Sequence, residues 1–192
     1  RRPLLALALF AAAFALREAT FPLREKSLKG QVALVTGGGG GIGRLMALGL
    51  AKQGCTVVLW DLNVDAATKV AEEIVASGGR AFAFKCDVSD RAAVYAVAQE
   101  TLAKTGGVVD ILINNAGIVS GKKLLEADDA RSELTMKVNT TALLWVTKAF
   151  LPGMMARKRG HVVTIASSAG RVGVAGMTDY CASKHGAVGF DE

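Results

Sequence analysis

Six glycines fall within seven consecutive positions, Gly37 to Gly43, in the stretch TGGGGGIG. The apolar run QVALV (31–35) precedes them, and the run RLMALGLAKQG (44–54), with apolar residues at helical spacing, follows them. Glycine inside a regular element costs about 0.5–1 kcal/mol relative to alanine, so this cluster meets a geometric need. A turn from a strand into a helix is the place where such a need arises, since the backbone there must often approach a ligand.

The glycine turn predicts a site for the pyrophosphate of a dinucleotide. Free N–H groups at the N-terminus of a helix stabilise a bound anion, and glycines let the backbone come close to it. The spacing Gly37-x3-Gly41-x-Gly43 departs from the usual GxGxxG, so a merely flexible loop is the alternative interpretation of Gly38 to Gly40. We expect Gly37, Gly41, Ile42 and Gly43 to contact the cofactor.

Short β-rich runs alternate with helical stretches from Gly30 onward, which is typical of βαβ units in a doubly wound parallel sheet. We therefore expect an α/β, Rossmann-type, three-layer αβα fold. The expected strands span 31–35, 55–61, 80–88, 108–117 and 160–170. The expected helices span 44–54, 63–79, 89–107 and 127–158, the last interrupted or ended near Pro152 and Gly153. A final helix begins near Tyr180, and the pattern then stops at Glu192, so we expect the domain to be truncated.

The charge of the chain argues against a nucleic-acid partner. The net charge is +6, but residues 1–29 hold six Lys/Arg and two Glu, which leaves only +2 for residues 30–192. Cys55, Cys86 and Cys181 are odd in number and widely spaced, so they indicate neither a disulfide framework nor a zinc site. His161 and His185 have no partner carboxylates in sequence, and we expect no metal.

The first segment, residues 1–29, differs in composition from the domain at 30–192. Its apolar run, Leu4 to Leu16, has 13 residues and basic residues on both sides. As a helix it reaches roughly 20 Å, against about 30 Å of membrane hydrocarbon. We interpret it as a truncated membrane anchor; a signal peptide, a transit peptide and a helix packed on the domain are the alternatives.

Asp61 follows the second expected strand, 18 residues after Gly43. An acidic side chain at this distance accepts hydrogen bonds from the ribose hydroxyls of the adenosine half of NAD. A carboxylate there repels the 2′-phosphate of NADP, and Gly40 offers no basic group to compensate. We therefore expect NAD rather than NADP. The alternative interpretation is that Asp61 only caps the following helix.

The next two strand ends carry further expected cofactor contacts. Asp87 and Val88 end the third strand, where the adenine ring would rest, and Asn115, Ala116 and Gly117 end the fourth. The carboxyl ends of parallel strands meet at one edge of the sheet, which is where open α/β sheets bind ligands. Two neighbouring asparagines are also common as turn caps. The asparagines lie at a strand end, as do the other expected cofactor contacts, and this favours a role in cofactor binding over a turn cap.

The expected reactive centre is the segment YCASK, with Tyr180 and Lys184. At spacing i, i+4 on a helix the two side chains share a face, so the ammonium favours the ionised form of the phenol. The pair has little weight alone, because Tyr-x3-Lys arises often by chance. Ser167, 13 residues before Tyr180 at the end of the fifth strand, gives it weight. Ser168, the next residue, is the alternative serine.

The motifs TGGGGGIG, NNAG, KVNT with Asn139, IASSAG and YCASK resemble, in order and spacing, those of the classical short-chain dehydrogenase/reductase family. The resemblance covers residues 31–190. Within the family, the segments GHVVTIASSAG and DYCASKHGAVGF and the apolar, basic N-terminus are most similar to the membrane-associated retinol and 17β-hydroxysteroid dehydrogenases.

The resemblance implies a role for each matching residue. Tyr180 would be the acid/base that takes the proton of the substrate hydroxyl, and Lys184 would lower its pKa and hold the nicotinamide ribose. Ser167 would hydrogen-bond the substrate oxygen, and Asn139 would position a water that links Lys184 to solvent. This is general acid/base chemistry beside a hydride-accepting ring, and it needs no metal.

The resemblance further implies an NAD-dependent oxidoreductase acting on a small lipophilic secondary or allylic alcohol, or the matching carbonyl, such as a retinoid or steroid. A 3-oxoacyl reductase of the same family and a catalytically silent nucleotide-binding or interaction protein are the alternatives. It also implies a homo-oligomer, associated with the endoplasmic reticulum or lipid droplets and facing the cytosol; a soluble cytoplasmic or organellar enzyme is the alternative.

Overall fold

The computed structural model describes residues 26–192. The expected membrane segment at Leu4 to Leu16 lies outside the described residues. Among the helices of the described part, none has the length and apolar character needed to cross a membrane.

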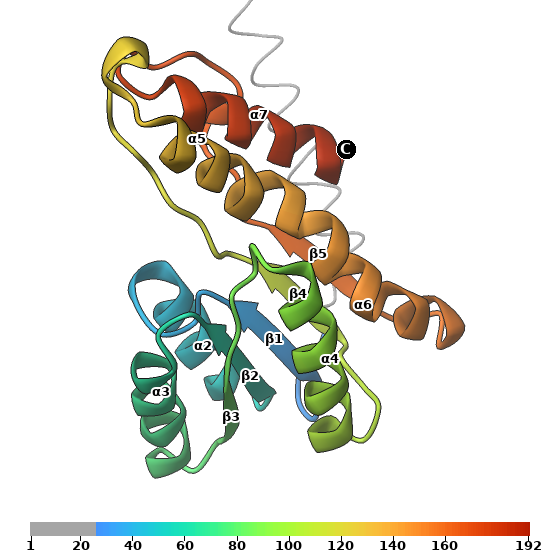
Figure 1. Cartoon of the computed structure of the whole chain (residues 1–192). Helices are drawn as coiled ribbons and strands as arrows, with labels where there is room; N and C mark the ends of the chain where they lie inside the picture. The colour runs from blue at the N-terminus through green and yellow to red at the C-terminus, as the bar shows by residue number, and fades with distance from the viewer. Residues whose placement is uncertain (1–25) are drawn as a thin grey trace, which may run out of the picture.

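Five parallel strands form one sheet in the order β3-β2-β1-β4-β5 (Figure 1). Their bounds are β1 Val32–Thr36, β2 Thr56–Asp61, β3 Arg80–Lys85, β4 Ile111–Asn114 and β5 His161–Thr164. The order reverses beside β1, which pairs with β2 on one side and β4 on the other. The doubly wound α/β fold expected from the sequence is therefore confirmed. Ligands of such sheets bind outside the carboxyl ends of the strands at this reversal.

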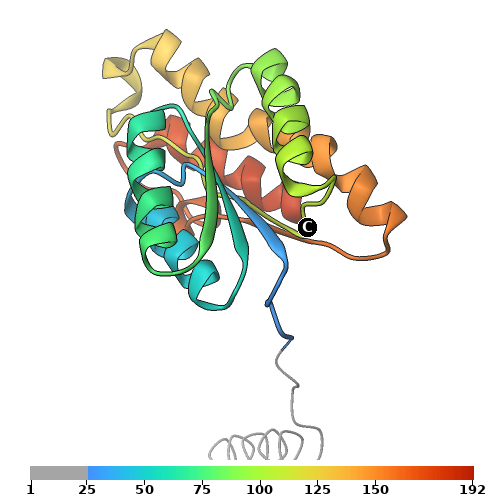
Figure 2. The same cartoon turned by 90° about the horizontal axis from the view of Figure 1, so that it is seen from below.

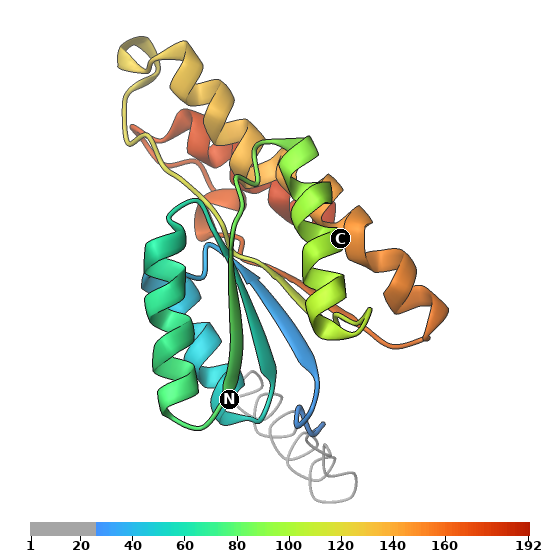
Figure 3. The same cartoon turned by 60° about the horizontal axis from the view of Figure 1, so that its bottom comes forward.

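Helices cover both faces of the sheet, which makes three layers (Figures 2 and 3). The helices are α2 Gly41–Lys52, α3 Val64–Ala76, α4 Arg91–Thr105, α5 Asp129–Met136, α6 Ala142–Ala156 and α7 Thr178–Asp191. Short helical turns lie at η1 Leu124–Glu126, η2 Lys137–Thr141 and η3 Ser168–Gly170. The helices α2 and α3 pack on one face, and α4 and α6 pack on the other. Helix α7 packs beside α5 and against β5.

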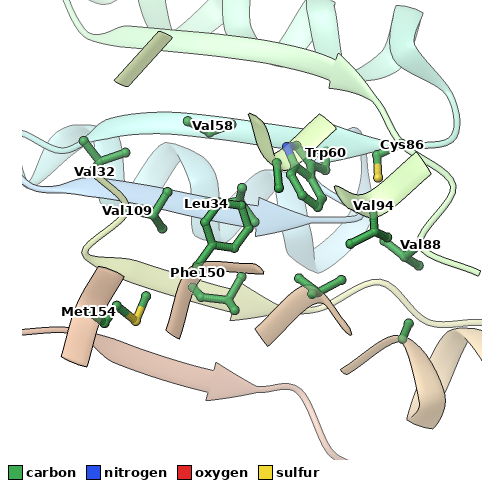
Figure 4. Close-up of a cluster of buried hydrophobic side chains, with 14 residues drawn as sticks. Val32, Leu34, Val58, Trp60, Cys86, Val88, Val94, Val109, Phe150 and Met154 are labelled. Atoms are coloured by element: carbon green, nitrogen blue, oxygen red, sulfur yellow. The ribbon is translucent and has the colours of Figure 1, made fainter. Parts of the chain in front are cut away.

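Alternation along the strands sends side chains into two separate cores. Leu34 and Trp60 point toward α4 and α6, where they meet Phe150 (Figure 4). Their neighbours Val35 and Leu59 point to the other face, against α2 and α3. Both sides of β1 and β2 are therefore buried, which explains why these strands are apolar throughout. The fully buried Trp60 donates a hydrogen bond to Thr101 Oγ1 at 2.9 Å, so its one polar atom is satisfied.

The expectation that the long helix ends near Pro152 is wrong. Helix α6 continues through Pro152 to Ala156, although proline leaves the carbonyl of Lys148 without its helical partner. Lys148 lies on the exposed face, where water can satisfy that carbonyl. Phe150 and Met154, each 3% exposed, anchor the helix on both sides of the proline. Burial of the face that carries Phe150 and Met154 offsets the lost hydrogen bond. Tertiary packing therefore overrides the low helix propensity of proline at this position.

The expected helix over 127–158 is also not one continuous α-helix. It consists of α5, the π-helical turn η2 and α6, and Asn139 lies inside the π-turn. Single π-turns within α-helices occur often at functional sites. Strands β3, β4 and β5 are shorter than expected, so Asp87, Asn115 and Ser167 lie in the loops that follow them.

Candidate active site

A cavity of about 1000 Å³ lies at the carboxyl ends of the strands. Its walls include residues at the ends of β1, β2, β3, β4 and β5 or in the loops that follow them, where the sequence predicted site residues. Of the expected cofactor residues, those that line it are Gly37, Ile42, Gly43, Asp61, Asp87, Val88, Asn115, Ala116, Gly117, Tyr180 and Lys184. Ser167 lines it as well. The structure therefore brings together residues that are up to 147 positions apart in sequence.

The glycine turn joins β1 to α2, and side chains are disfavoured at several of its positions by backbone conformation or by lack of space. Gly37 has φ +65°, a conformation that L side chains rarely adopt. A Cβ on Gly43 would overlap the carbonyl oxygen of Gly37 and lie 2.7 Å from Asn115 Nδ2. The turn is therefore packed against its own strand and the loop after β4. Gly41, at φ +50°, begins α2 but is not among the residues that line the cavity.

Asn115 and Thr36 hold the glycine turn against the loop after β4. Asn115 Nδ2 donates to the carbonyls of Thr36 and Gly37 at 2.8 and 3.2 Å. In return, Thr36 Oγ1 accepts from the backbone N–H groups of Asn115 and Ala116, both at 3.0 Å. No role was expected for Thr36, although it begins the glycine motif TGGGGGIG. The position of Thr36 could have indicated this role, because a buried hydroxyl at the end of a strand needs a hydrogen-bond partner.

Asp61 ends β2 and faces the glycine turn. Its Oδ2 accepts from the N–H of Gly39 at 2.8 Å, and its Oδ1 accepts from the N–H of Asn63 at 2.9 Å. A carboxylate oxygen has two lone pairs, so both oxygens retain capacity to accept from ribose hydroxyls. Asn63 is the residue that caps α3, accepting from Ala66 N at 3.1 Å. The alternative interpretation of Asp61 as the cap of this helix is therefore wrong.

The loop after β3 forms the wall where the adenine is expected. Asp87 Oδ1 accepts from the N–H and hydroxyl of Ser89, at 2.9 and 2.7 Å, which fixes the turn. Trp145 of α6 donates its indole N–H to the carbonyl of Val88 at 2.8 Å. Cys86 also lines this wall, and burial, aided by Asp87 and Asp90, raises its pKa to about 12. It therefore stays a protonated, unreactive thiol at neutral pH.

Tyr180 and Lys184 share one face of α7, as the i, i+4 spacing predicts. Lys184 Nζ lies 5.9 Å from the centroid of the Tyr180 ring. The same amine donates to the carbonyl of Ile165 at 2.6 Å, just after β5. Ser167 follows two residues later and caps η3, its Oγ accepting from Ala169 N at 3.2 Å. Ser167 lines the cavity and Ser168 does not, which favours Ser167 as the serine of the site.

The side chain of Lys184 is 5% exposed, and burial lowers its pKa from the ordinary value of 10.5. Between the lowered pKa and 10.5, the unfolded chain binds more protons than the folded protein, so stability rises with pH. Relative to Lys184→Met, the free energy of unfolding of the wild type should therefore increase as pH rises through this window. Urea unfolding of both proteins at several pH values measures the difference. A difference that stays flat or falls with pH would contradict the buried, desolvated amine.

Asn139 lies next to this site but does not line the cavity. Its Oδ1 accepts from Ile118 N and its Nδ2 donates to Ile118 O, both at 2.8 Å. The same Nδ2 donates to Ser183 Oγ at 2.9 Å. The side chain of Asn139 thus clamps the loop after β4 to α7. The water-positioning role expected for Asn139 stays a prediction.

Further residues line the cavity that the sequence did not reveal. They include Ile118, Val119, Arg131, Val138 and Met177. Most are apolar and come from the loop after β4, from α5 and η2, and from the segment before α7. No motif marks them, because apolar side chains at these positions look the same whether they face a core or a ligand. The four apolar side chains among these five make the part of the cavity that they line suited to a lipophilic molecule.

The model of the short chain dehydrogenase family matches residues 31–192 of this chain. The chain belongs to the short-chain dehydrogenase family. This confirms the family expected from the five motifs. Curated relatives place it near the retinol dehydrogenases: it is 48% identical to epidermal retinol dehydrogenase 2 of Homo sapiens over 177 residues. It is 44% identical to retinol dehydrogenase 10-B of Danio rerio over 189 residues.

The alignments with the human and zebrafish relatives cover 91% and 88% of this chain, but 56% of each relative. The chain therefore spans little more than half the length of these curated relatives.

Solved structures of related proteins have the same fold. A metagenomic short-chain oxidoreductase in complex with NADP superposes with a TM-score of 0.81 and 42% identity, covering 86% of this chain and 75% of that one. A short-chain dehydrogenase/reductase of Burkholderia phymatum in complex with NAD superposes with a TM-score of 0.83 and 32% sequence identity. That alignment covers 86% of this chain and 59% of the other. A nicotinamide cofactor is thus common to these neighbours.

Proposed function

We propose that this protein transfers a hydride between NAD(H) and a lipophilic secondary or allylic alcohol or the matching carbonyl, and that the substrate is a retinoid or a steroid. The observation that carries the proposal is that Ser167, Tyr180 and Lys184 line the same cavity as the glycine turn. A dinucleotide on the turn would bring its nicotinamide toward Tyr180. The relatives named retinol dehydrogenases support the substrate class.

The residues present fit a nicotinamide dinucleotide. The glycine turn, with its overlap at Gly43, is a cradle that a Cβ would fill, and α2 presents the free N–H groups of its first turn there. Asp87 and Val88 would hold the adenine, and Asn115, Ala116 and Gly117 would line the path to the nicotinamide. When bound, the cofactor supplies the hydride acceptor. We propose NAD over NADP because Asp61 would repel a 2′-phosphate.

The residues around the reacting atoms divide the proton chemistry. In oxidation, Tyr180 would accept the proton of the substrate hydroxyl through its phenolic oxygen, and Ser167 would donate a hydrogen bond to the substrate oxygen. Lys184, held by the Ile165 carbonyl, would present its amine to the tyrosine and the nicotinamide ribose. The apolar wall formed by Ile118 and Val119 would exclude water from the substrate side.

Turnover by the longest natural form of the protein tests this proposal. With NAD we expect oxidation of all-trans-retinol or of a 17β-hydroxysteroid, followed by the appearance of NADH. A 3-oxoacyl thioester with NADH or NADPH is the comparison substrate, and efficient reduction of it alone would favour the 3-oxoacyl reductase alternative. Cofactor binding without turnover of any alcohol or carbonyl would favour the catalytically silent alternative.

We also propose that the protein forms a homo-oligomer through α6. Leu144, Leu151 and Met155 are 48%, 39% and 68% exposed, and their spacing places them along one side of the helix. An exposed apolar stripe of this kind favours burial against a second copy. Membrane association through residues 1–29, at the endoplasmic reticulum or lipid droplets, rests on the apolar run flanked by basic residues and is likewise a proposal.

A further inference from the structure

The residue directly before Tyr180 makes two hydrogen bonds with a single oxygen. Asp179 Oδ1 accepts from Ser120 Oγ at 2.7 Å and from the N–H of Tyr180 at 2.8 Å. Ser120 lies in the loop after β4, 59 positions earlier in sequence, whereas Asp179 lies in the first turn of α7. One carboxyl oxygen therefore joins this loop to the backbone of the proposed acid/base.

The tethered loop forms part of the cavity wall. Ile118 and Val119, which directly precede Ser120, both line the cavity, as does Tyr180. Asn139 holds the loop at Ile118 through both backbone groups of that residue, and Asp179 holds it at Ser120. Val119 lies between the two fixed points and is 47% exposed. Its distance from the substrate therefore depends on the tether at Ser120.

The second oxygen of Asp179 has an unusual environment. Oδ2 is buried and has no hydrogen-bond partner within the described residues 26–192. A buried unpaired oxygen costs stability, and such groups call for an explanation. Neither Asp179 nor Ser120 lines the cavity, so direct contact with substrate does not supply one. The two hydrogen bonds accepted by Oδ1 are a reason for a carboxyl group to be held at this position.

We propose that Asp179 is a positioning residue: through Ser120 it sets the distance between the apolar wall at Ile118 and Val119 and the phenol of Tyr180. The proposal rests on the function proposed above, since it concerns the same cavity. It also makes a chemical distinction. The amide of Asp179→Asn keeps an Oδ1 that accepts both hydrogen bonds, whereas Asp179→Ala removes them.

The kinetic test compares Asp179→Ala, Asp179→Asn, Ser120→Ala and the double alanine variant in the longest natural form. For Ser120→Ala we expect the KM of the alcohol to rise about fivefold with kcat unchanged, because only the wall is released. For Asp179→Ala we expect the same rise in KM and a fall in kcat of about tenfold. The double variant should resemble Asp179→Ala, since both changes break one link. Asp179→Asn should stay within about twofold of wild type, as should Asp129→Ala, an exposed aspartate in the first turn of α5.

Additive losses in the double variant, or an Asp179→Asn variant as impaired as Asp179→Ala, would overturn the proposal. So would a parallel rise in the dissociation constant of NADH, since that indicates a general structural defect. Rates are expressed per NADH-binding site, which removes any unfolded fraction from the comparison.

Amide hydrogen exchange of residues 116–123 in the 192-residue chain supplies a second readout that needs no turnover. We expect exchange to accelerate at least about tenfold in Asp179→Ala and in Ser120→Ala, and to stay unchanged in Asp179→Asn. Unchanged exchange in both alanine variants would show that no tether exists. If wild type lacks turnover but this exchange pattern appears, the proposed function fails while the tether stands. If wild type shows normal turnover but exchange is unchanged in both alanine variants, the tether fails while the proposed function stands.

Discussion

Replacing Tyr180 with phenylalanine should abolish turnover while leaving cofactor binding intact. Phenylalanine keeps the ring that lies 5.9 Å from Lys184 Nζ but removes the hydroxyl that would exchange a proton with substrate. General acid/base catalysis contributes about 10²- to 10⁴-fold, so we expect kcat for alcohol oxidation to fall by about 10³-fold. Steady-state kinetics with NAD and the preferred alcohol measure this loss.

Tyr95 provides the matched control, because it is the other of the two tyrosines in the chain. It lies on α4, is 40% exposed and does not line the cavity. Tyr95→Phe should therefore retain wild-type kcat. Turnover of Tyr180→Phe within about tenfold of wild type would contradict the acid/base role, since so small a loss is below what a proton-transfer group contributes.

Replacing Gly43 with alanine should produce the largest loss of cofactor affinity. The added Cβ would overlap the carbonyl oxygen of Gly37 and press on Asn115 Nδ2, so the glycine turn and the loop after β4 must separate. Both loops form the expected pyrophosphate and nicotinamide path. We expect the dissociation constant of NADH to rise at least about 30-fold, equivalent to about 2 kcal/mol. Nicotinamide fluorescence during titration of the folded variant measures this constant.

Gly49 on the same helix supplies the comparison for Gly43. It is exposed, and a Cβ there would meet no atom within 4 Å. Alanine inside a helix is favoured over glycine by about 0.8–1.0 kcal/mol, so Gly49→Ala should bind NADH normally and melt at a higher temperature. Equal affinities of the Gly43→Ala and Gly49→Ala variants would show that the turn does not bind the cofactor.

The sequence revealed the features that depend on local order. The alternation of strands and helices predicted the parallel sheet, and the positions of Asp61 and Asn115 at strand ends predicted one shared edge. The spacing of Tyr180 and Lys184 predicted a common helical face. Each of these inferences needs only residue type, spacing and the rule that parallel strands end at one edge.

Features that depend on long-range packing were not visible in the sequence. Helix α6 continues through Pro152 because Phe150 and Met154 are buried on both sides of the proline. The sequence pattern does not show whether this burial outweighs the hydrogen bond that proline cannot donate. The clamp between Thr36 and Asn115 joins residues 79 positions apart. The amide of Asn139, inside the π-turn η2, bonds the backbone of Ile118, and the sequence predicted neither this pairing nor the π-turn.

A titration of the purified protein with NADH and with NADPH tests the central claim most directly, namely that the cavity between the glycine turn and Tyr180 binds a nicotinamide dinucleotide. With circular dichroism to confirm folding, we expect NADH to bind at least about tenfold more tightly than NADPH, because Asp61 would repel the 2′-phosphate. Tighter binding of NADPH would contradict the role of Asp61. Failure of a folded sample to bind either cofactor would contradict the site itself.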